Sequence, residues 1–244
     1  MIVSRRLLLA AALVAAWLPG FSIAQDKPND AIVAAPREGT WMKRHDSFNE
    51  RVKQGNADLI FIGDSITAGW EGVPPRGGKE VWAEFYGKRN AVNLGIGGDR
   101  TQHVLWRLDH GNIDGIKPKL AVLMIGTNNS RDNTSDQIAS GVKAIVEKLR
   151  TKLPATKVLI LAIFPRGADK DDPQRKTNEG ANATIQKLAD GQMVHYLDIG
   201  PKFLEADGTL SREVMPDLLH LNEKSYRTWA ESTEPKIKEL LGEK

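Results

Sequence analysis

The sequence lacks cysteine throughout its 244 residues. This absence excludes disulfide bonds, thiolate metal ligands, a cysteine nucleophile and a cysteine-linked lipid anchor. The sequence also lacks a strong charge of one sign. It contains 34 Lys and Arg residues and 31 Asp and Glu residues, which gives a net charge of +3. Residues 1–24 supply two of the positive charges and no acid, so residues 25–244 carry 32 − 31 = +1. Charge therefore gives no support for a nucleic-acid partner.

The N-terminus carries one apolar run, Leu7–Leu18, whose 12 residues are too few to cross a bilayer. The run follows the basic stretch Met1–Arg6, and Ser22-Ile23-Ala24 places small residues at −3 and −1 before Gln25. We expect residues 1–24 to be an export signal cleaved after Ala24, which leaves no membrane anchor and a periplasmic or secreted protein. The paired arginines in this stretch fit both Sec and twin-arginine export, and both routes stay open.

The rest of the chain has the composition of one globular domain, with 41% hydrophobic and 27% charged residues over the whole sequence. Residues 25–40, rich in Asp, Asn, Pro and Ala, are expected to form an N-terminal tail. No Pro- or Gly-rich linker interrupts the remainder. We therefore predict a single domain over residues 41–244.

Short apolar runs, rich in Val, Ile and Leu, alternate with helical patterns in this domain. The runs predict buried strands at 58–62, 91–94, 120–125, 158–164 and 194–199. Helices are expected at 41–53, 102–108, 179–188 and 223–231, and most clearly around 138–149, where Thr134 and Gln137 have the spacing of a capping box. Regular alternation of strand and helix predicts an α/β domain with a parallel sheet.

Three polar, Gly-rich turns follow three of these strands. They are Gly63-Asp64-Ser65, Gly95–Arg100 and Gly126–Asn129. Because ligands bind beyond the carboxyl ends of the strands in open parallel sheets, the turns are expected to line one crevice. Near the C-terminus, Asp217 and His220 are three residues apart, so we expect them on one side of a helical turn.

These residues supply the groups needed for acyl transfer. A serine hydroxyl such as Ser65 needs a neighbouring base, which His220 can provide, and Asp217 can orient the imidazole. The backbone N–H groups of Ser65 and Gly98 and the side-chain amide of Asn128 are candidates for stabilising an oxyanion.

Each motif also has an ordinary structural interpretation. Gly-Asp-Ser after a strand is often a turn that caps a helix, and Asn128-Asn129 is often an Asx turn. Gly95–Gly98 resembles part of a dinucleotide-binding fingerprint, but Arg100 stands where the third glycine would be, so a nucleotide-binding protein is disfavoured.

Several further residues have less specific patterns. Asp64, Asp99 and His103 are candidates for the rim of the site, and Asp198 is a fallback acid without a nearby histidine. We expect structural roles for the remaining histidines, His45, His110 and His195. Trp70, Trp82 and Trp106 could stack on a sugar near the site, although tryptophan at helical spacing more often belongs to the core.

The motifs Gly63-Asp64-Ser65, Gly98, Gly126-x-Asn128 and Asp217-x-x-His220 resemble the four blocks of the SGNH (GDSL) hydrolase family, in the same order. Asn93–Leu108, Ile116–Lys119, Gly126–Asn129 and Phe164–Gly167 are similar to a subgroup of that family, the catalytic subunits of platelet-activating-factor acetylhydrolase. The resemblance extends from about Ala57 to Trp229.

The resemblance implies a flavodoxin-like three-layer α/β/α sandwich with a five-stranded parallel sheet in the order 2-1-3-4-5. It also implies a serine esterase with Ser65, Asp217 and His220 as the triad, and Ser65, Gly98 and Asn128 as the oxyanion hole. No metal or organic cofactor is expected. The resemblance does not indicate the oligomeric state.

The expected export separates this chain from the cytosolic relatives, and exported bacterial members of the wider family are often carbohydrate acetylesterases. We therefore expect a small-molecule or polysaccharide ester substrate, with a short acyl group such as O-acetyl. A lysophospholipase or thioesterase and a non-catalytic carbohydrate-binding protein are the alternatives, and the acyl chain length and the alcohol stay open.

Overall fold

The computed structural model describes residues 28–243 and shows one parallel five-stranded sheet. Its strands lie in the order β2-β1-β3-β4-β5, as predicted, and every neighbouring pair is parallel. The strands are β1 (Leu59–Gly63), β2 (Ala91–Gly95), β3 (Leu120–Met124), β4 (Lys157–Leu161) and β5 (Val194–Leu197). All five residues of β1 and of β3 are buried, which explains why these strands have no polar alternation.

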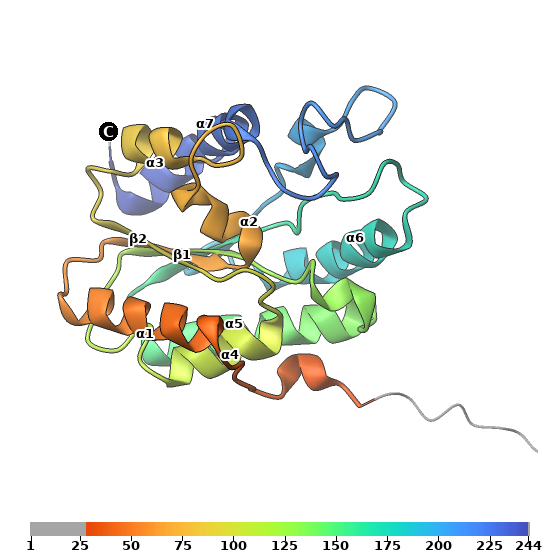
Figure 1. The fold of residues 1–244 in the computed structure, drawn as a ribbon. Helices are drawn as coiled ribbons and strands as arrows, with labels where there is room; N and C mark the ends of the chain where they lie inside the picture. Colours follow the sequence, from red (N-terminus) through yellow and green to blue (C-terminus); the bar gives the residue numbers. More distant parts are fainter. Residues whose placement is uncertain (1–27, 244) are drawn as a thin grey trace, which may run out of the picture.

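Helices cover both faces of the sheet and complete the expected three layers (Figure 1). The α-helices are α1 (Thr40–Lys53), α2 (Ser65–Ala68), α3 (Lys79–Phe85), α4 (Thr101–Asp109), α5 (Ser135–Lys152), α6 (Pro173–Ile185) and α7 (Glu223–Leu241). Apolar residues of α1, α4, α5 and α6 pack on one face, and those of α2, α3 and α7 pack on the other. The fold is therefore the flavodoxin-like sandwich that the resemblance implied.

Two of the observed helices extend beyond the ranges predicted for them. The helix expected at 179–188 begins at Pro173, because Asp172 caps the Arg175 N–H and proline is well suited to the first helical turn. The helix expected at 223–231 continues through Pro235 to Leu241. The capping box of Thr134 and Gln137 is present, as predicted.

The carboxyl ends of the three adjacent strands β2, β1 and β3 are level. Gly63 at the end of β1 pairs with Gly95 of β2 and with Met124 of β3. A Cβ atom at Gly63 would lie 2.4 Å from the Met124 carbonyl oxygen, so only glycine fits there. This close register brings the turns that follow β1, β2 and β3 to one edge of the sheet.

Residues 28–40, within the segment expected to be a tail, pack onto the domain. The short 3-10 helix η1 (Asp30–Ile32) lies against α4 and α5, and Ala31 is fully buried. The Asp30 carboxylate accepts a hydrogen bond from Asn133 at 2.6 Å. The expected export signal lies outside the described residues. Within residues 28–243, none of the helices has the length and apolarity that a membrane crossing requires.

Candidate active site

Ser65 stands at the first position of α2, directly after β1. The Asp64 side chain caps this short helix by accepting a hydrogen bond from the Ile66 N–H at 2.9 Å. The Ser65 N–H belongs to the first turn of a helix, where backbone donors have no acceptor within the helix. The serine therefore presents a hydroxyl and a backbone donor at the same edge of the sheet.

The structure brings Ser65, His220 and Asp217 into one hydrogen-bonded chain. The Ser65 Oγ is 2.9 Å from His220 Nε2, and His220 Nδ1 is 2.7 Å from Asp217 Oδ2. Asp217 Oδ1 also accepts a hydrogen bond from the His220 backbone N–H at 2.7 Å. The Asp217 carboxylate thus holds both the backbone and the ring of the histidine.

The prediction that Asp217 and His220 share a helical turn is wrong. The segment is a non-helical turn in which Leu218 has φ of 60°, a left-handed conformation that is unfavourable for a branched side chain. The Leu218 carbonyl accepts a hydrogen bond from the Gly167 N–H at 2.9 Å, which ties this turn to the loop after β4. The three-residue spacing correctly indicated that the side chains of Asp217 and His220 lie close together. A turn capped by Asp217, and not a helix, brings them together.

Electrostatics suit a base at His220. Partial burial raises the pKa of Asp217, but the hydrogen bonds from His220 outweigh burial and hold this pKa below its usual range. The carboxylate therefore stays ionised and accepts the Nδ1–H of the imidazole. Nε2 is then free to accept the hydroxyl proton of Ser65.

The candidate oxyanion donors lie beside this chain. A Cβ atom at Gly97 would be 4.0 Å from Ser65 Cβ, so the turn after β2 passes directly by the nucleophile. Gly98 has φ of 75°, a conformation that favours glycine. The Asn128 Nδ2 group donates one hydrogen bond to the Asp99 carbonyl oxygen at 2.9 Å. A primary amide has two N–H bonds, so the other can serve a substrate oxygen.

Arg37 supports the Gly97–Gly98 turn, a role that the sequence analysis did not predict. Arg37 donates a hydrogen bond to the Gly97 carbonyl oxygen at 2.8 Å and lies 3.6 Å from the Asp99 carboxylate. Arg37 belongs to the segment interpreted as a tail, where a lone arginine gives no signal in the sequence. The arginine fixes the turn that carries the Gly98 donor.

Two of the three residues expected at the rim lie beneath the site. Asp99 is fully buried, where it accepts hydrogen bonds from Trp41 Nε1 at 2.6 Å and from Arg107 Nε at 2.9 Å. Asp64 is also fully buried, and burial raises its pKa to about 7. The Asp64 carboxyl group caps the Ile66 N–H, whereas the Asp99 carboxylate binds the side chains of Trp41 and Arg107, and these partners explain the inward orientation of both groups.

His103, the third residue expected at the rim, is partly buried on α4. Its ring accepts a hydrogen bond from the Arg100 N–H at 2.9 Å. Burial lowers the pKa of His103 to about 4, and the neighbouring Arg37 adds to this effect, so the ring is neutral. Asp198 caps the Gly200 N–H at 2.8 Å and is not the partner of His220.

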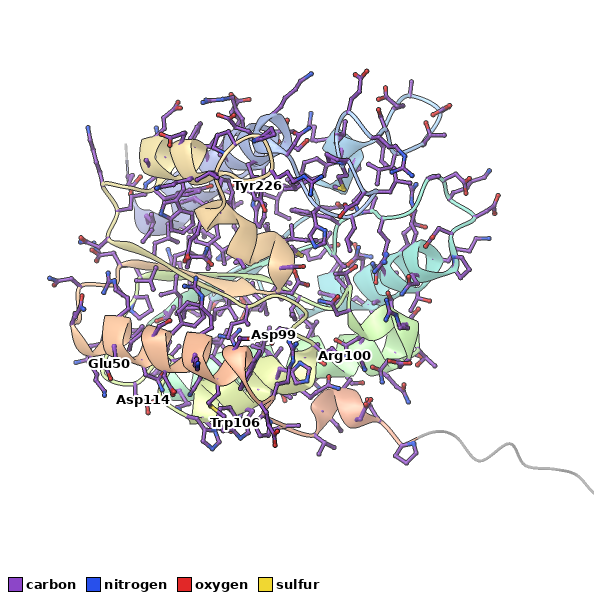
Figure 2. All side chains as sticks on the ribbon, viewed as in Figure 1. Glu50, Asp99, Arg100, Trp106, Asp114 and Tyr226 are labelled. Carbon is purple, nitrogen blue, oxygen red and sulfur yellow. The ribbon has the colours of Figure 1, made fainter. Side chains whose placement is uncertain are left out.

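The remaining aromatic candidates serve packing. Trp70 is buried against Tyr226, and Trp82 packs on Phe61. Trp106 stacks on His110 with ring centroids 3.7 Å apart, and Figure 2 shows it farther from the sheet than Asp99. The stacking of sugar on these tryptophans is therefore not supported, and the core interpretation holds. His45 is buried, and His195 lies on β5.

A polar cavity of about 220 Å³ opens beside the oxyanion candidates Gly98 and Asn128. Arg100, Arg131 and Arg166 line it. A second, smaller cleft of about 110 Å³ adjoins Asp217 and His220. Residues 28–243 contain no cluster of histidine and carboxylate side chains arranged to hold a metal ion. The candidate site thus places a serine hydroxyl, an imidazole, a carboxylate and a set of hydrogen-bond donors between two small cavities.

Comparison with known proteins assigns this geometry to a family. Residues 61–228 match the GDSL-like lipase/acylhydrolase family. The chain belongs to this family. It is 38% identical over 190 residues to platelet-activating factor acetylhydrolase IB subunit alpha1 of Homo sapiens, with 78% of this chain and 79% of the relative covered. It is 37% identical over 207 residues to subunit alpha2 of Rattus norvegicus, with 83% and 86% covered.

Solved structures of GDSL hydrolases share the fold. A GDSL-like lipase from Bacteroides thetaiotaomicron superposes with a TM-score of 0.64 at 19% identity, covering 81% of this chain and 97% of that one. An acetylxylan esterase from Geobacillus stearothermophilus gives a TM-score of 0.59 at 19% identity, covering 78% and 96%. The expected SGNH membership is confirmed, and this GDSL hydrolase is a carboxylic ester hydrolase.

Proposed function

We propose that this GDSL hydrolase is an exported serine esterase that removes short acyl groups, above all O-acetyl, from carbohydrate. Ser65, His220 and Asp217 act as its triad, and Ser65, Gly98 and Asn128 form its oxyanion hole. The observation that carries this proposal is the hydrogen-bonded chain from Ser65 Oγ through the His220 ring to Asp217, with distances of 2.9 and 2.7 Å.

The reaction proceeds by two acyl transfers. His220 Nε2 takes the hydroxyl proton while Ser65 Oγ attacks the ester carbonyl, and the oxyanion is stabilised by the donors of the Gly98 turn and by Asn128. The C–O bond to the alcohol then breaks, and His220 returns the proton to the departing oxygen. Water attacks the acyl-enzyme by the same route, which releases the carboxylic acid and restores Ser65.

The size of the cavities supports a short acyl group. The two hollows beside the triad measure about 220 and 110 Å³, which is below the range of about 300–1,000 Å³ for pockets that enclose larger ligands. The structural neighbour from Geobacillus stearothermophilus is named an acetylxylan esterase, which supports an acetylated carbohydrate.

A lipid ester is the second candidate, favoured by one observation. The curated relatives that are 37–38% identical are named subunits of a platelet-activating factor acetylhydrolase. A non-catalytic carbohydrate-binding protein is disfavoured, because a binding protein has no need of the aligned Ser65, His220 and Asp217 side chains.

The deciding experiment compares p-nitrophenyl esters of increasing acyl length, together with acetate release from acetylated xylan. We expect the highest kcat/KM for the acetyl ester and release of acetate from the polysaccharide. A preference for C8–C16 esters would favour the lipid hydrolase instead.

Ser65→Ala should lower kcat for p-nitrophenyl acetate by a factor of about 10⁴ or more, because within residues 28–243 no other hydroxyl is hydrogen-bonded to the His220 ring. Circular dichroism of the variant should match that of the wild type. Turnover retained at the wild-type rate in Ser65→Ala would refute the assignment of the nucleophile.

A further inference from the structure

The polar cavity beside Gly98 and Asn128 contains more positive charge than hydrolysis of a neutral ester requires. Arg100 reaches it from the start of α4, Arg131 from the 3-10 helix η3 (Asn129–Arg131), and Arg166 from the loop after β4. Three separate segments therefore bring a guanidinium group to one small space. Among the described residues that line this cavity, none is an acid.

The three arginines differ in how far their charge is already neutralised. Arg100 pairs with Asp132 at 2.6 Å. Arg166 donates to the carbonyl and hydroxyl oxygens of Thr127, each at 3.2 Å, and no carboxylate of the described residues lies within 4.0 Å of its guanidinium. Arg131 is exposed and belongs to no ion pair within 4.0 Å among the described residues. The ion pair of Arg100 with Asp132 neutralises one of the three positive charges, so the cavity keeps a positive charge.

The pKa of Arg166 shows that the charges act on one another. Burial lowers this pKa and the positive charge of Arg131 lowers it further, while the more distant carboxylates of Asp172, Asp64 and Asp217 oppose the change. Like positive charges that are held together in a concave polar site attract an anion, and the bound anion reduces the repulsion between them. Guanidinium groups also bind carboxylate and phosphate oxygens through paired N–H donors.

We propose that this arginine cavity binds a compact anionic group, a carboxylate or a phosphate, that the substrate carries close to its scissile ester. The proposal rests on the ester hydrolysis described above and adds the charge of the preferred substrate. Gly98 and Asn128 belong both to the oxyanion candidates and to the cavity wall, so the anion lies next to the ester carbonyl. Substrates of this class include O-acetylated acidic sugars and acetylated sugar or polyol phosphates.

The test uses pairs of esters that differ only in the anion. One pair is acetylated methyl glucuronate and acetylated methyl glucoside with the same hydroxyl esterified. The other is acetylated glycerol phosphate and glycerol monoacetate. We expect kcat/KM to be about tenfold higher for the anionic member of at least one pair, and added salt to reduce this preference. The pair that shows the preference identifies the anion as carboxylate or phosphate.

Arg131→Gln and Arg100→Gln should each reduce the ratio of anionic to neutral kcat/KM by a factor of about three to ten. The matched control is Arg227→Gln on α7, which removes one positive charge from a pair with Glu84 and should leave the ratio unchanged. Ratios near one for both pairs, or a preference that both cavity variants retain, would overturn the proposal.

Binding of the four compounds to Ser65→Ala, measured by calorimetry, separates this inference from the proposed function. Tighter binding of an anionic compound supports the cavity even if turnover is absent, and equal binding of each pair overturns it. Failure of the esterase proposal would appear separately, as the absence of p-nitrophenyl acetate hydrolysis by the wild-type protein.

Discussion

At the scale of single residues, the carboxyl group beneath the nucleophile is the most perturbed acid near the site. Asp64 is fully buried and caps the Ile66 N–H through Oδ1, whereas its Oδ2 has no hydrogen-bond partner in residues 28–243. Burial raises its pKa from 3.8 to about 7. The folded chain therefore holds a proton on Asp64 over a pH range in which the unfolded chain has lost it.

This raised pKa predicts a pH-dependent contribution to stability. The contribution is fully present below pH 3.8 and is lost as the pH rises to about 7, because the unfolded chain ionises more readily. Asp64→Asn keeps the capping oxygen and cannot ionise. The free energy of unfolding of Asp64→Asn, relative to that of the wild type, should therefore rise by a few kcal/mol between pH 4 and pH 8. The size of this rise follows from the difference in pKa between the folded and unfolded chain, because each pKa unit corresponds to about 1.4 kcal/mol.

Urea denaturation of both proteins at several pH values measures this difference. Asp58→Asn provides the control: this half-buried acid lies away from the site, and the hydrogen bond from Asn90 lowers its pKa, so the variant should show no such rise. Parallel stability curves for Asp64→Asn and the wild type would show that Asp64 is ionised in the folded state.

Sequence reasoning named the candidate catalytic side chains, which the structure brings together, but it did not predict their local geometry. Ser65, His220 and Asp217 could be named because serine, histidine and aspartate at these positions form a recognisable pattern, and the structure places them in contact. The left-handed Leu218 and the buried positions of Asp64 and Asp99 could not be predicted, since they depend on which side of a turn the sheet and helices cover.

At the scale of elements, the segment before α1 is part of the site. Arg37 holds the Gly97 carbonyl at 2.8 Å, and η1 attaches the same segment to α4 and α5. Composition alone predicted a tail here, because Asp, Asn and Pro are common in disordered termini. The hydrogen bonds of Asp30 and Arg37 join it to residues 60 to 103 positions away, and no local pattern records such contacts.

Arg37→Ala should therefore impair catalysis without a comparable loss of substrate binding. The Gly97–Gly98 turn loses a charge-assisted hydrogen bond, so the Gly98 donor is less well positioned when the oxyanion forms. We expect kcat for p-nitrophenyl acetate to fall about tenfold with KM nearly unchanged, and Arg37→Lys to restore part of the rate.

Arg51→Ala is a suitable control for this effect. Its guanidinium also bonds backbone oxygens, those of Gly55 and Asn56 at the end of α1, but it has no contact with the site. A rise in KM with unchanged kcat in Arg37→Ala would show that Arg37 contacts the substrate instead of positioning the turn.

At the scale of the whole molecule, one sheet joins two apolar cores. Trp41 and Trp106 pack on the face covered by α1 and α4, whereas Trp70, Trp82 and Trp229 pack on the face covered by α3 and α7. Since alternate residues of every strand point into each core, neither core can persist when the sheet opens. The alternation of strands and helices in the sequence predicted an α/β domain with a parallel sheet, whereas the strand order followed only from the family resemblance.

Phe61→Ala tests the coupling of the two cores. Phe61 lies 5.0 Å from Trp82 and 4.9 Å from Tyr86 between ring centroids, so its loss should cost about 3–5 kcal/mol. In a Trp41→Phe, Trp106→Phe background starting at Gln25, fluorescence reports only one face. Its unfolding midpoint and that of far-UV circular dichroism should fall together. Separate midpoints would mean that the two faces unfold independently.

The order of the functional groups along the chain has a consequence for synthesis. Ser65 is separated from His220 by 155 residues, and the base and its acid lie just before the last helix. A nascent chain can complete the first strand, the nucleophile turn and both oxyanion turns while it still has no base. With the proposed triad, hydrolytic competence arises only when the C-terminal part docks, so the protein stays inactive until its own folding is complete.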